Sequence, residues 1–421
     1  MADYKIISPK RAVGAISLPA SKSISNRALI LNALCGGKSQ LRNVAHCDDT
    51  DAMERALAQL RRARGGERIE VNIGAAGTAM RFLTAYIASC EGLTVLLDGS
   101  ERMRQRPISV LVDALRSCGA QIDYAQSEGF PPLLIRGQKL KAAEVEISGE
   151  VSSQYISAIL MISPRIEGCK TILLSGQVIS LPYIEMTLGL MREFGVEAAM
   201  RDAEIVLAPN AAYSRSCDYE VESDWSAASY WFEIASLLPE SEILLKGLHE
   251  QSLQGDQSVC CYFKPLGVKA EYTADGVVLR GGEPVSGRIE MDLSGNPDLA
   301  QTIVVTACVK GVPFVISGLQ TLKIKETDRI AALQSQLRKL GYVIEEIEGN
   351  SLCWDGTMCP AEQSPEIATF EDHRMAMAFA PAAVKFEGLK ILNAGVVSKS
   401  YPDYWQHLQS VGFEVKGGEQ I

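Results

Sequence analysis

Two interleaved series of glycines recur along the chain at a period of about 70 residues. In the first series a short strand-like run ends at a glycine, and successive glycines are 77, 71, 71 and 77 residues apart. In the second series a helix-like segment with apolar residues at i, i+3 and i+4 ends at a glycine, at intervals of 76, 72, 74 and 71 residues. A glycine just after the last turn is a common helix stop.

The members of the two series alternate along the chain. The strand-like runs LTVLLDG, TILLSG, EILLKG, PFVISG and KILNAG end at Gly99, Gly176, Gly247, Gly318 and Gly395. The helix-like segments end at Gly119, Gly195, Gly267, Gly341 and Gly412. A hairpin-like stretch follows each helix, most clearly AEYTADGVVLRG (270–281) with Asp275-Gly276 as its turn. A more compact copy is expected over residues 38–75, with its helix near DAMERALAQLRR.

These patterns predict about six copies of one αβ unit. The period is too long for a solenoid repeat and suits a small subdomain of mixed strands and helices. The alternative is one irregular α/β domain with chance glycine spacing, but two series that share one period argue against chance. A length of 421 residues also favours two or three domains over one core.

The six copies predict two domains of three repeats each. The chain has no low-complexity linker, and the expected joints lie near PASKS (19–23) and VESDW (221–225). We therefore expect residues 21–223 to form one domain, and residues 1–20 with 224–421 to form the other. The N-terminal strand IISPKRAVGAISL then belongs with the C-terminal half. A cleft between two such domains is a common place for a ligand.

The composition excludes several classes of function. A net charge of −10 with 6% aromatic residues opposes a nucleic-acid or anionic-membrane surface. The chain has no apolar run of about 18 residues, and its start lacks a signal-peptide core, so a cytoplasmic protein is expected. The eleven scattered cysteines contain no CxxC pair and predict free thiols. With only four histidines and no Cys/His cluster, no metal site is expected.

Two helix starts combine glycine or hydroxyl groups with cations. PASKSISNRAL (19–29) places Lys22, Ser23 and Arg27 where outward-pointing backbone amides attract anions. GAAGTAMRF (74–82) allows close backbone approach to a ligand. Neither segment is a Walker loop or a GxGxxG motif, so a nucleotide site is not supported.

Further segments rich in charge or hydroxyl groups lie at the same kind of position. They are ERMRQRPI (101–108), VSSQYISA (151–158), NPDLAQT (296–302), KIKETDRIAAL (323–333), EDHRMAMAFA (371–380) and SKSYPDYW (398–405). Taken singly, each is as compatible with a helix cap or a salt bridge as with a site. Together they predict one cleft that binds more than one phosphate or carboxylate. The residues alone indicate an enzyme of a phosphosugar or other polyanionic metabolite, with no cofactor.

The order of these motifs resembles the 5-enolpyruvylshikimate-3-phosphate synthases over nearly the whole chain, with KETDR and DHRMAM the most specific. The resemblance implies an α/β fold of two domains, each made of three βαβαββ units, with the active site in the interdomain cleft. It implies transfer of the enolpyruvyl group of phosphoenolpyruvate to the 5-hydroxyl of shikimate-3-phosphate, in the shikimate pathway of aromatic amino-acid biosynthesis. A monomer is the family expectation.

The resemblance also implies individual roles. Shikimate-3-phosphate would be bound by Lys22, Ser23, Arg27, Ser152, Ser153, Gln154, Ser180, Asp298, Thr321 and Lys325. Phosphoenolpyruvate would be bound by Lys22, Gly77, Arg106, Gln154, Arg329, Arg374 and Lys399. Among the proton-transfer residues, Asp298 would be the base toward the hydroxyl and Glu326 the acid at C3. Lys22 would assist the departing phosphate, and His373 completes the set.

The chain departs from the family pattern at three positions. Ala75 stands where Asn is frequent, Thr321 where an Asn often contacts the substrate phosphate, and Phe82 where Pro is usual. We expect these differences to change affinity and the response to phosphonate analogues of phosphoenolpyruvate more than the type of reaction.

The sequence opposes two rival functions. The related UDP-N-acetylglucosamine enolpyruvyl transferases carry a reactive Cys five residues before the loop arginine, and this chain has Glu101 there. A non-catalytic anion-binding protein would have lost the proton-transfer residues, and this chain keeps them.

Overall fold

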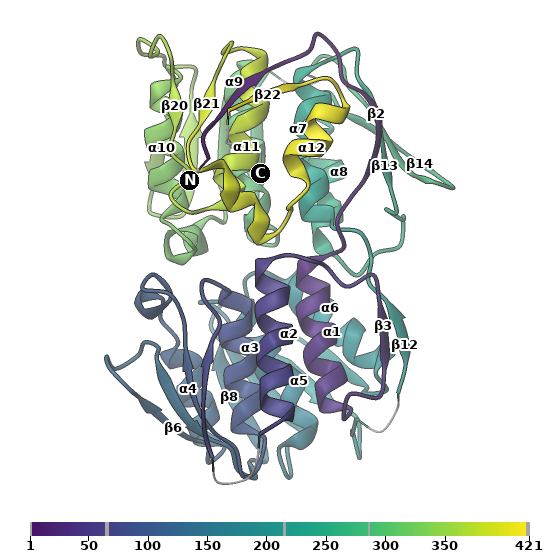
Figure 1. The fold of residues 1–421 in the computed structure, drawn as a ribbon, viewed down its shortest axis with the longest axis vertical. Coiled ribbons are helices and arrows are strands. Elements are labelled where there is room, and N and C mark those ends of the chain that lie inside the picture. Colours follow the sequence, from purple (N-terminus) through teal and green to yellow (C-terminus); the bar gives the residue numbers. More distant parts are fainter. Residues whose placement is uncertain (1, 64–66, 214–215, 285–286, 418–421) are drawn as a thin grey trace. The chain divides into compact units, whose positions relative to one another are not determined.

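The computed structural model of the protein describes residues 2–63, 67–213, 216–284 and 287–417. The chain divides into two compact units: unit 1 consists of Met1–Pro19 and Glu222–Ile421, and unit 2 of Ala20–Val221. Figure 1 shows the order of their elements along the chain. No helix in the described part of the chain is both long and apolar enough to cross a membrane.

Unit 2 alternates helices with short strands. Its helices are α1 (Lys22–Leu34), α2 (Asp48–Arg61), α3 (Gly77–Ala88), α4 (Ser109–Ser117), α5 (Ser153–Ile162) and α6 (Leu181–Glu193). Its strands are β3 (Gln40–Arg42), β4 (Arg68–Asn72), β5 (Thr94–Asp98), β6 (Gln121–Tyr124), β7 (Leu133–Arg136), β8 (Glu144–Ser148), β9 (Thr171–Ser175), β10 (Ala198–Arg201), β11 (Glu204–Leu207) and β12 (Asp218–Glu220). They form sheets of order β4-β5-β7-β6 and β10-β11-β9-β8, and the pair β12-β3.

Unit 1 is built in the same way. Its helices are α7 (Trp225–Leu237), α8 (Val259–Phe263), α9 (Ala300–Lys310), α10 (Arg329–Lys339), α11 (His373–Phe379) and α12 (Tyr404–Ser410). Its strands are β1 (Tyr4–Ile7), β2 (Val13–Ser17), β13 (Glu242–Lys246), β14 (Lys269–Thr273), β15 (Gly276–Arg280), β16 (Ile289–Asp292), β17 (Phe314–Ser317), β18 (Glu345–Ile347), β19 (Ser351–Trp354), β20 (Glu366–Ile367), β21 (Lys390–Ile391) and β22 (Glu414–Lys416). The sheets have the orders β20-β21-β1-β22, β14-β15-β13-β2 and β16-β17-β19-β18.

All five four-stranded sheets share one strand arrangement, in which a parallel pair is extended by two further antiparallel strands. In unit 2, β4 runs parallel to β5, and β5 is antiparallel to β7, which pairs with β6. In unit 1 the N-terminal strands complete two of the sheets, because β2 pairs with β13 and β1 pairs with β21 and β22. The compact copy has only α1, β3 and α2, with β12 parallel to β3. The predicted βαβαββ repeat is therefore confirmed in the five four-stranded sheets, whereas the compact copy keeps only part of the unit.

The glycines that define the helix series end helices in the left-handed conformation. Gly119, Gly195, Gly267, Gly341 and Gly412 have φ between 83° and 104°. A side chain strains this backbone conformation, so glycine is favoured at each stop. The hairpin at 270–281 is also present, but its turn lies at residues 274–275. Gly276 already belongs to β15, where an added Cβ would lie 2.0 Å from the carbonyl oxygen of Leu245 on the neighbouring strand β13.

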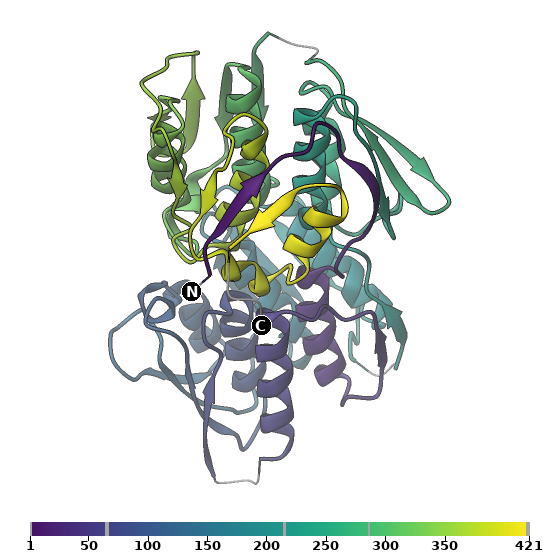
Figure 2. The same cartoon turned by 45° about the horizontal axis from the view of Figure 1, so that its top comes forward.

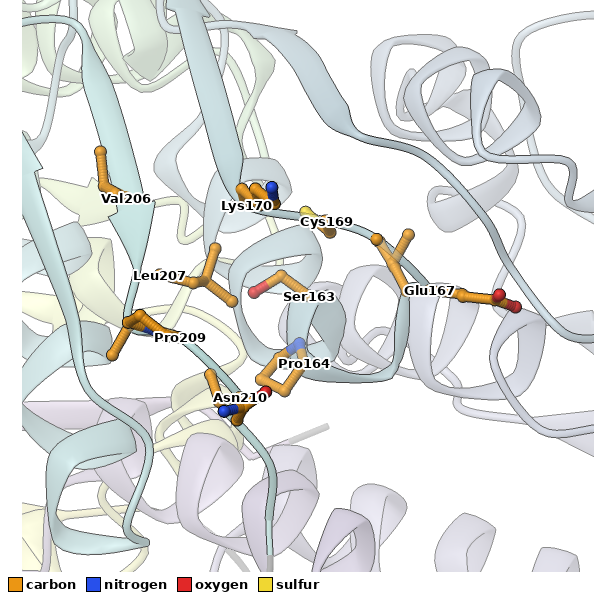
Figure 3. Close-up of a pocket in the computed structure, with 13 residues that line it drawn as sticks. Ser163, Pro164, Glu167, Cys169, Lys170, Val206, Leu207, Pro209 and Asn210 are labelled. Carbon is orange, nitrogen blue, oxygen red and sulfur yellow. The ribbon is translucent and has the colours of Figure 1, made fainter.

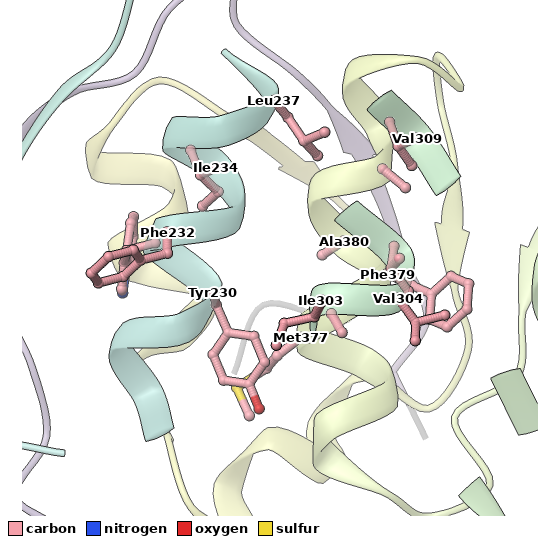
Figure 4. Packing of buried hydrophobic residues seen from close by; sticks show 14 of the residues in the cluster. Tyr230, Phe232, Ile234, Leu237, Ile303, Val304, Val309, Met377, Phe379 and Ala380 are labelled. Atoms are coloured by element: carbon pink, nitrogen blue, oxygen red, sulfur yellow. The ribbon is translucent and has the colours of Figure 1, made fainter. Parts of the chain in front are cut away.

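The first helix of each repeat lies in the interior of its unit. Eleven of the twelve residues of α3 are buried, and twelve of the thirteen residues of α7. A helix that is buried on all sides needs apolar or small residues all round, which these sequences supply. Figures 1 and 2 show α1, α2 and α3 side by side in unit 2. In unit 1, α7, α9 and α11 pack through Tyr230, Ile234, Ile303 and Met377 (Figure 4).

Candidate active site

The predicted site residues of unit 2 lie mostly at the N-terminal ends of its interior helices. Lys22 is the first residue of α1, Gly77 is the first of α3, and Ser152 is the N-cap of α5. Unpaired backbone N–H groups and the helix dipole give such ends a partial positive charge, which favours anions. Each unit contributes its own set of residues, and each set is described by itself.

Lys22 is held by a carboxylate of the neighbouring helix. Its Nζ lies 3.0 Å from Oδ2 of Asp49 in the first turn of α2, and the Asp49 side chain is buried. Ser21 caps α1 by accepting a hydrogen bond from the backbone N–H of Ile24. The ammonium group is thus fixed at the start of α1 by a partner that the sequence did not reveal.

Gly77 and Arg106 are packed against each other. A Cβ at Gly77 would lie 2.5 Å from Nη1 of Arg106, so only glycine lets the guanidinium occupy this place. The buried Arg81 connects the helix that carries Gly77 to the loop that carries Arg106. It donates to the carbonyl oxygen of Gly77 at 3.1 Å and to that of Pro107 at 3.2 Å. These bonds join α3 to the backbone of the loop that carries Arg106.

Of the three arginines in 101–108, only Arg106 lies at the predicted site. Arg104 is bound to Asp98, with Nε 2.9 Å from Oδ1. Arg102 donates to the side chain of Gln105 in an exposed turn. Of the three arginines that the sequence suggested as anion-binding groups, only the buried Arg106 therefore remains a candidate.

The hydroxyl and amide groups of 152–154 surround the start of α5. The Ser152 hydroxyl accepts a hydrogen bond from the backbone N–H of Gln154, and the Gln154 amide donates to the Thr78 hydroxyl at 3.2 Å. This bond links the starts of α5 and α3. Ser180, the residue before α6, has φ 56° and ψ 38°, and its side chain makes no capping bond. A non-glycine residue in this left-handed conformation is a type of strain found at ligand sites.

The side chain of Arg27 is almost completely buried, unlike that of an anion-binding residue on the surface. Its guanidinium is 2% exposed and donates to Thr187, Ser157 and the carbonyl oxygens of Ser23 and Tyr183. Burial lowers the pKa of this group to about 10, so it is still charged at neutral pH. These bonds use four of its five N–H donors, and among the described residues one N–H on Nη1 remains.

In unit 1 the predicted residues are joined by ion pairs centred on Arg329. The guanidinium is 2% exposed, and its three nitrogens face three carboxylates. Nε lies 2.7 Å from Asp372, Nη1 3.0 Å from Asp298 and Nη2 2.9 Å from Glu326. Burial alone would lower the pKa of Arg329, but the three carboxylates raise it above its ordinary value.

Further cations surround the same carboxylates. Arg374 lies 2.9 Å and Lys325 3.4 Å from Asp298, and Lys399 lies 3.6 Å from Glu326. Burial would raise the pKa of Asp298, but Arg374, Lys325 and Arg329 together hold it well below its usual range. With Asp372, four cations face three carboxylates, so the cluster carries one net positive charge. An excess of cations in a partly buried cluster suits an anionic ligand.

His373 and Thr321 complete the unit 1 set. His373 is the first residue of α11 and is buried, with Nδ1 3.8 Å from Asp372. Thr321 lies in the 3₁₀ helix η5 (Gln320–Ile324), also buried. Its hydroxyl has no hydrogen-bond partner among the described residues. A buried unpaired hydroxyl is rare, and a ligand oxygen is one way to satisfy it.

Two residues of the site were missed from the sequence. Asp49 holds Lys22, and Asp372 holds Arg329 and caps α11 through the backbone N–H of Arg374. Both lie in acidic segments at a helix start, DDTD and EDHR, and these segments are the sequence feature that could have indicated them.

A cavity of about 600 Å³ in unit 2 lies apart from these residues. Ser163, Lys170, Leu207 and Asn210 are among its lining residues, and no predicted site residue lines it (Figure 3). It is formed where α5 ends, whereas Ser152 lies where α5 begins.

The chain matches the family model of EPSP synthase (3-phosphoshikimate 1-carboxyvinyltransferase) over residues 6–408. The chain belongs to the EPSP synthase family. A 3-phosphoshikimate 1-carboxyvinyltransferase of Bacteroides fragilis (strain YCH46) is 48% identical over 417 residues, which are 99% of this chain and 100% of the relative. The enzyme of the same name from Vibrio atlanticus (strain LGP32) is 38% identical over 95% of this chain and 97% of its own.

The fold is likewise that of solved EPSP synthases. The structure of EPSP synthase from Acinetobacter baumannii matches with a TM-score of 0.78 over 100% of both chains, at 20% identity. The predicted two-domain fold of this family is thereby confirmed.

Proposed function

We propose that the chain transfers the enolpyruvyl group of phosphoenolpyruvate to the 5-hydroxyl of shikimate-3-phosphate and releases inorganic phosphate. The hydroxyl oxygen forms a bond to C2 of phosphoenolpyruvate while C3 takes up a proton, which gives a tetrahedral phosphate ketal. The ketal then loses phosphate by cleavage of the C2–O bond, and C3 returns a proton. The product is an enol ether, made in the shikimate pathway of aromatic amino-acid biosynthesis.

Phosphoenolpyruvate carries a phosphate and a carboxylate, and both need cationic partners. We assign these groups to Lys22, Gly77, Arg106, Gln154, Arg329, Arg374 and Lys399. Guanidinium groups fit a planar carboxylate or a phosphate with two parallel hydrogen bonds. Arg329 and Arg106 are both buried, and Arg329 is paired with Asp372, so Arg329 presents its charge with little loss of side-chain freedom on binding.

We assign shikimate-3-phosphate to the remaining cations and hydroxyl groups. The residues are Lys22, Ser23, Arg27, Ser152, Ser153, Gln154, Ser180, Asp298, Thr321 and Lys325. Ser152, Ser153, Ser180 and Lys325 would hold the phosphate. Ser180 has a side chain that makes no capping bond to its helix, and the buried hydroxyl of Thr321 has no partner in the part of the chain that the structure describes. Both observations support these residues as ligand contacts.

Asp298 is the proposed base for the 5-hydroxyl. In the free protein its carboxylate faces Arg374, Lys325 and Arg329, which hold its pKa well below the usual range, so it is ionised but weakly basic. An anionic substrate that draws Lys325 and Arg374 toward its own oxygens weakens this stabilisation. The pKa of Asp298 then rises toward that of a useful base.

Glu326 is the proposed acid at C3, and it takes the proton back in the elimination step. Its carboxylate lies between Arg329 at 2.9 Å and Lys399 at 3.6 Å. Lys22 would donate a hydrogen bond to the departing phosphate, and Asp49 orients its ammonium group. His373 is assigned to the same proton-transfer set at the start of α11.

The observation that carries the proposal is the pairing of Asp298 and Glu326 with four cations, the buried Arg329 among them, in a chain of this family. The test is phosphate release from phosphoenolpyruvate, with shikimate-3-phosphate or UDP-N-acetylglucosamine as the only acceptor. Release with shikimate-3-phosphate alone is expected. Release with the nucleotide sugar alone, or with neither although both ligands bind, contradicts the proposal.

We further infer that the protein acts as a monomer in the cytoplasm. A monomer is the expectation for this family. All eleven cysteines are free thiols, as expected of a reducing compartment.

A further inference from the structure

Three helices of unit 2 meet at one buried hydrogen-bond network. Arg27 of α1 donates from Nε to the Thr187 hydroxyl of α6 at 2.7 Å, and from Nη2 to the Ser157 hydroxyl of α5 at 3.2 Å. The two hydroxyl oxygens lie 2.9 Å apart. Ser157 and Thr187 have no exposed surface, so water does not compete for these bonds.

The direction of each hydrogen bond in the network follows from the number of protons. The hydroxyl proton of Thr187 goes to the carbonyl oxygen of Tyr183 at 2.8 Å. Thr187 can then only accept from Arg27 and Ser157, so Ser157 donates to Thr187 and accepts from Arg27. No proton is left over, and the loss of either hydroxyl leaves a buried donor without a partner.

The aromatic ring of Phe82 packs against the same guanidinium. Its centroid lies 5.3 Å from Cζ of Arg27, and the ring is completely buried on α3. A cation over an aromatic face is stabilised by the ring quadrupole. Phe82 thus connects a fourth helix, α3, to the helices α1, α5 and α6 that the hydrogen bonds join.

Arg27 is a buried cation that no carboxylate of the described residues pairs with. Its acceptors are two hydroxyls and two carbonyls, all of them neutral. Burial of a charge without an opposite charge is costly, so an anionic group at the N–H of Nη1 would be stabilised there. The starts of α1, α5 and α6 carry Ser23, Ser152–Gln154 and Ser180, which the proposed function assigns to shikimate-3-phosphate.

We propose that Thr187, Ser157 and Phe82 are positioning residues for the acceptor. They fix Arg27 so that it holds the starts of α1, α5 and α6 in the arrangement that fits shikimate-3-phosphate, and they aim the remaining N–H of Nη1 at one of its anionic groups. None of the three needs to touch the substrate. This inference rests on the proposed function, because it concerns the acceptor of that reaction.

The test compares Thr187→Val with Thr187→Ser in steady-state kinetics, after turnover of the wild-type protein has been measured. Thr187→Val keeps the shape but removes both acceptor positions, and we expect the KM for shikimate-3-phosphate to rise about tenfold. The KM for phosphoenolpyruvate should rise clearly less, because only Lys22 and Gln154 of its proposed partners lie at the helix starts that Arg27 holds. Thr187→Ser keeps the hydroxyl and should restore the KM to within about twofold of the wild-type value.

Thr84→Val is the matched control. Thr84 is equally buried in unit 2, and its hydroxyl donates only within its own helix, to the carbonyl oxygen of Met80. Thr84→Val therefore loses a buried hydroxyl without disturbing Arg27, and we expect both of its KM values to stay unchanged. If Thr187→Val does not fold, Ser157→Ala replaces it. A rise of about threefold is then expected, because the hydrogen bond from Arg27 to Thr187 is kept.

The outcomes separate this inference from the proposed function. Absence of turnover in the wild-type protein overturns the proposed function. Wild-type turnover with an unchanged KM for shikimate-3-phosphate in Thr187→Val overturns the positioning role alone. An equal rise of both KM values, without rescue by serine, also overturns it, since that result indicates general damage to the fold.

Discussion

Arg329 and Asp372 form an ion pair that is almost completely shielded from solvent, with Nε 2.7 Å from Oδ2. The carboxylate has no exposed surface and also caps α11 by accepting from the backbone N–H of Arg374. One aspartate therefore fixes the position of two cations that we assign to phosphoenolpyruvate.

The replacement Asp372→Ala leaves Arg329 buried with one partner fewer. We expect the free energy of unfolding to fall by about 3 kcal/mol, because a buried charge loses its opposite charge. The KM for phosphoenolpyruvate should rise at the same time. Urea unfolding and steady-state kinetics measure the two effects. Asp355→Ala, at an exposed turn, is the control. It removes one exposed hydrogen bond, so it should lower the free energy of unfolding much less and leave the KM unchanged. An Asp372→Ala variant with unchanged stability and KM would contradict the account.

Asp298 predicts a loss of stability in acid. Its pKa in the folded protein lies well below 3.8, so its ionised form is favoured by folding. This contribution is present above the unfolded pKa and is lost as the pH falls through the folded pKa. The melting temperature of the wild-type protein should therefore fall below about pH 4 more steeply than that of Asp298→Asn. Parallel curves for the two proteins would show that Asp298 contributes nothing to the acid dependence.

Glu233 predicts the opposite dependence on pH. Its carboxyl is fully buried on α7, and burial raises its pKa well above 4.5, although the Thr306 hydroxyl acts in the opposite direction. Above about pH 4.5 this carboxyl ionises in the unfolded chain but stays protonated in the folded protein. The unfolded state is therefore increasingly favoured, and the stability of the fold decreases as the pH rises. Between pH 5 and pH 9 the wild-type melting temperature should fall more than that of Glu233→Gln. Glu54→Gln, at an exposed position of α2, should follow the wild type.

Gly77→Ala tests the packing of Arg106. The added methyl carbon would lie 2.5 Å from Nη1, so the guanidinium must move. A displacement of about 1 Å at a binding group can cost on the order of a hundredfold in activity, and we expect at least a tenfold rise in the KM for phosphoenolpyruvate. The melting temperature should change little, because the end of a flexible side chain can shift.

The control for this variant is Gly287→Ala, where an added Cβ meets no atom within 4 Å. It should leave the kinetics unchanged. An unchanged KM in Gly77→Ala would mean that Arg106 does not bind phosphoenolpyruvate.

The repeats were readable from the sequence because the helix stops need glycine for a physical reason. Every glycine of the second series has the positive φ that other residues rarely adopt. Helix lengths were less predictable. The segment before Gly267 forms only the short helix α8, which ends at Phe263 shortly before Pro265, a residue that cannot donate within a helix.

The partners of the site residues were not predictable. Asp49 meets Lys22 and Asp372 meets Arg329 only because separate helices bring them together. Local sequence marks the ends of those helices but not which ends meet. The unpaired hydroxyl of Thr321 and the left-handed backbone of Ser180 are likewise properties of the folded chain.

The reaction in D₂O tests the central claim most directly. Phosphoenolpyruvate and shikimate-3-phosphate are incubated with the protein in D₂O, and the product is analysed by mass spectrometry and NMR. Addition and elimination pass through a methyl group at C3, so we predict an enol ether that carries deuterium at C3, together with released phosphate. Glu326→Gln should form it more slowly. An enol ether without deuterium, or no enol ether at all, would contradict the account.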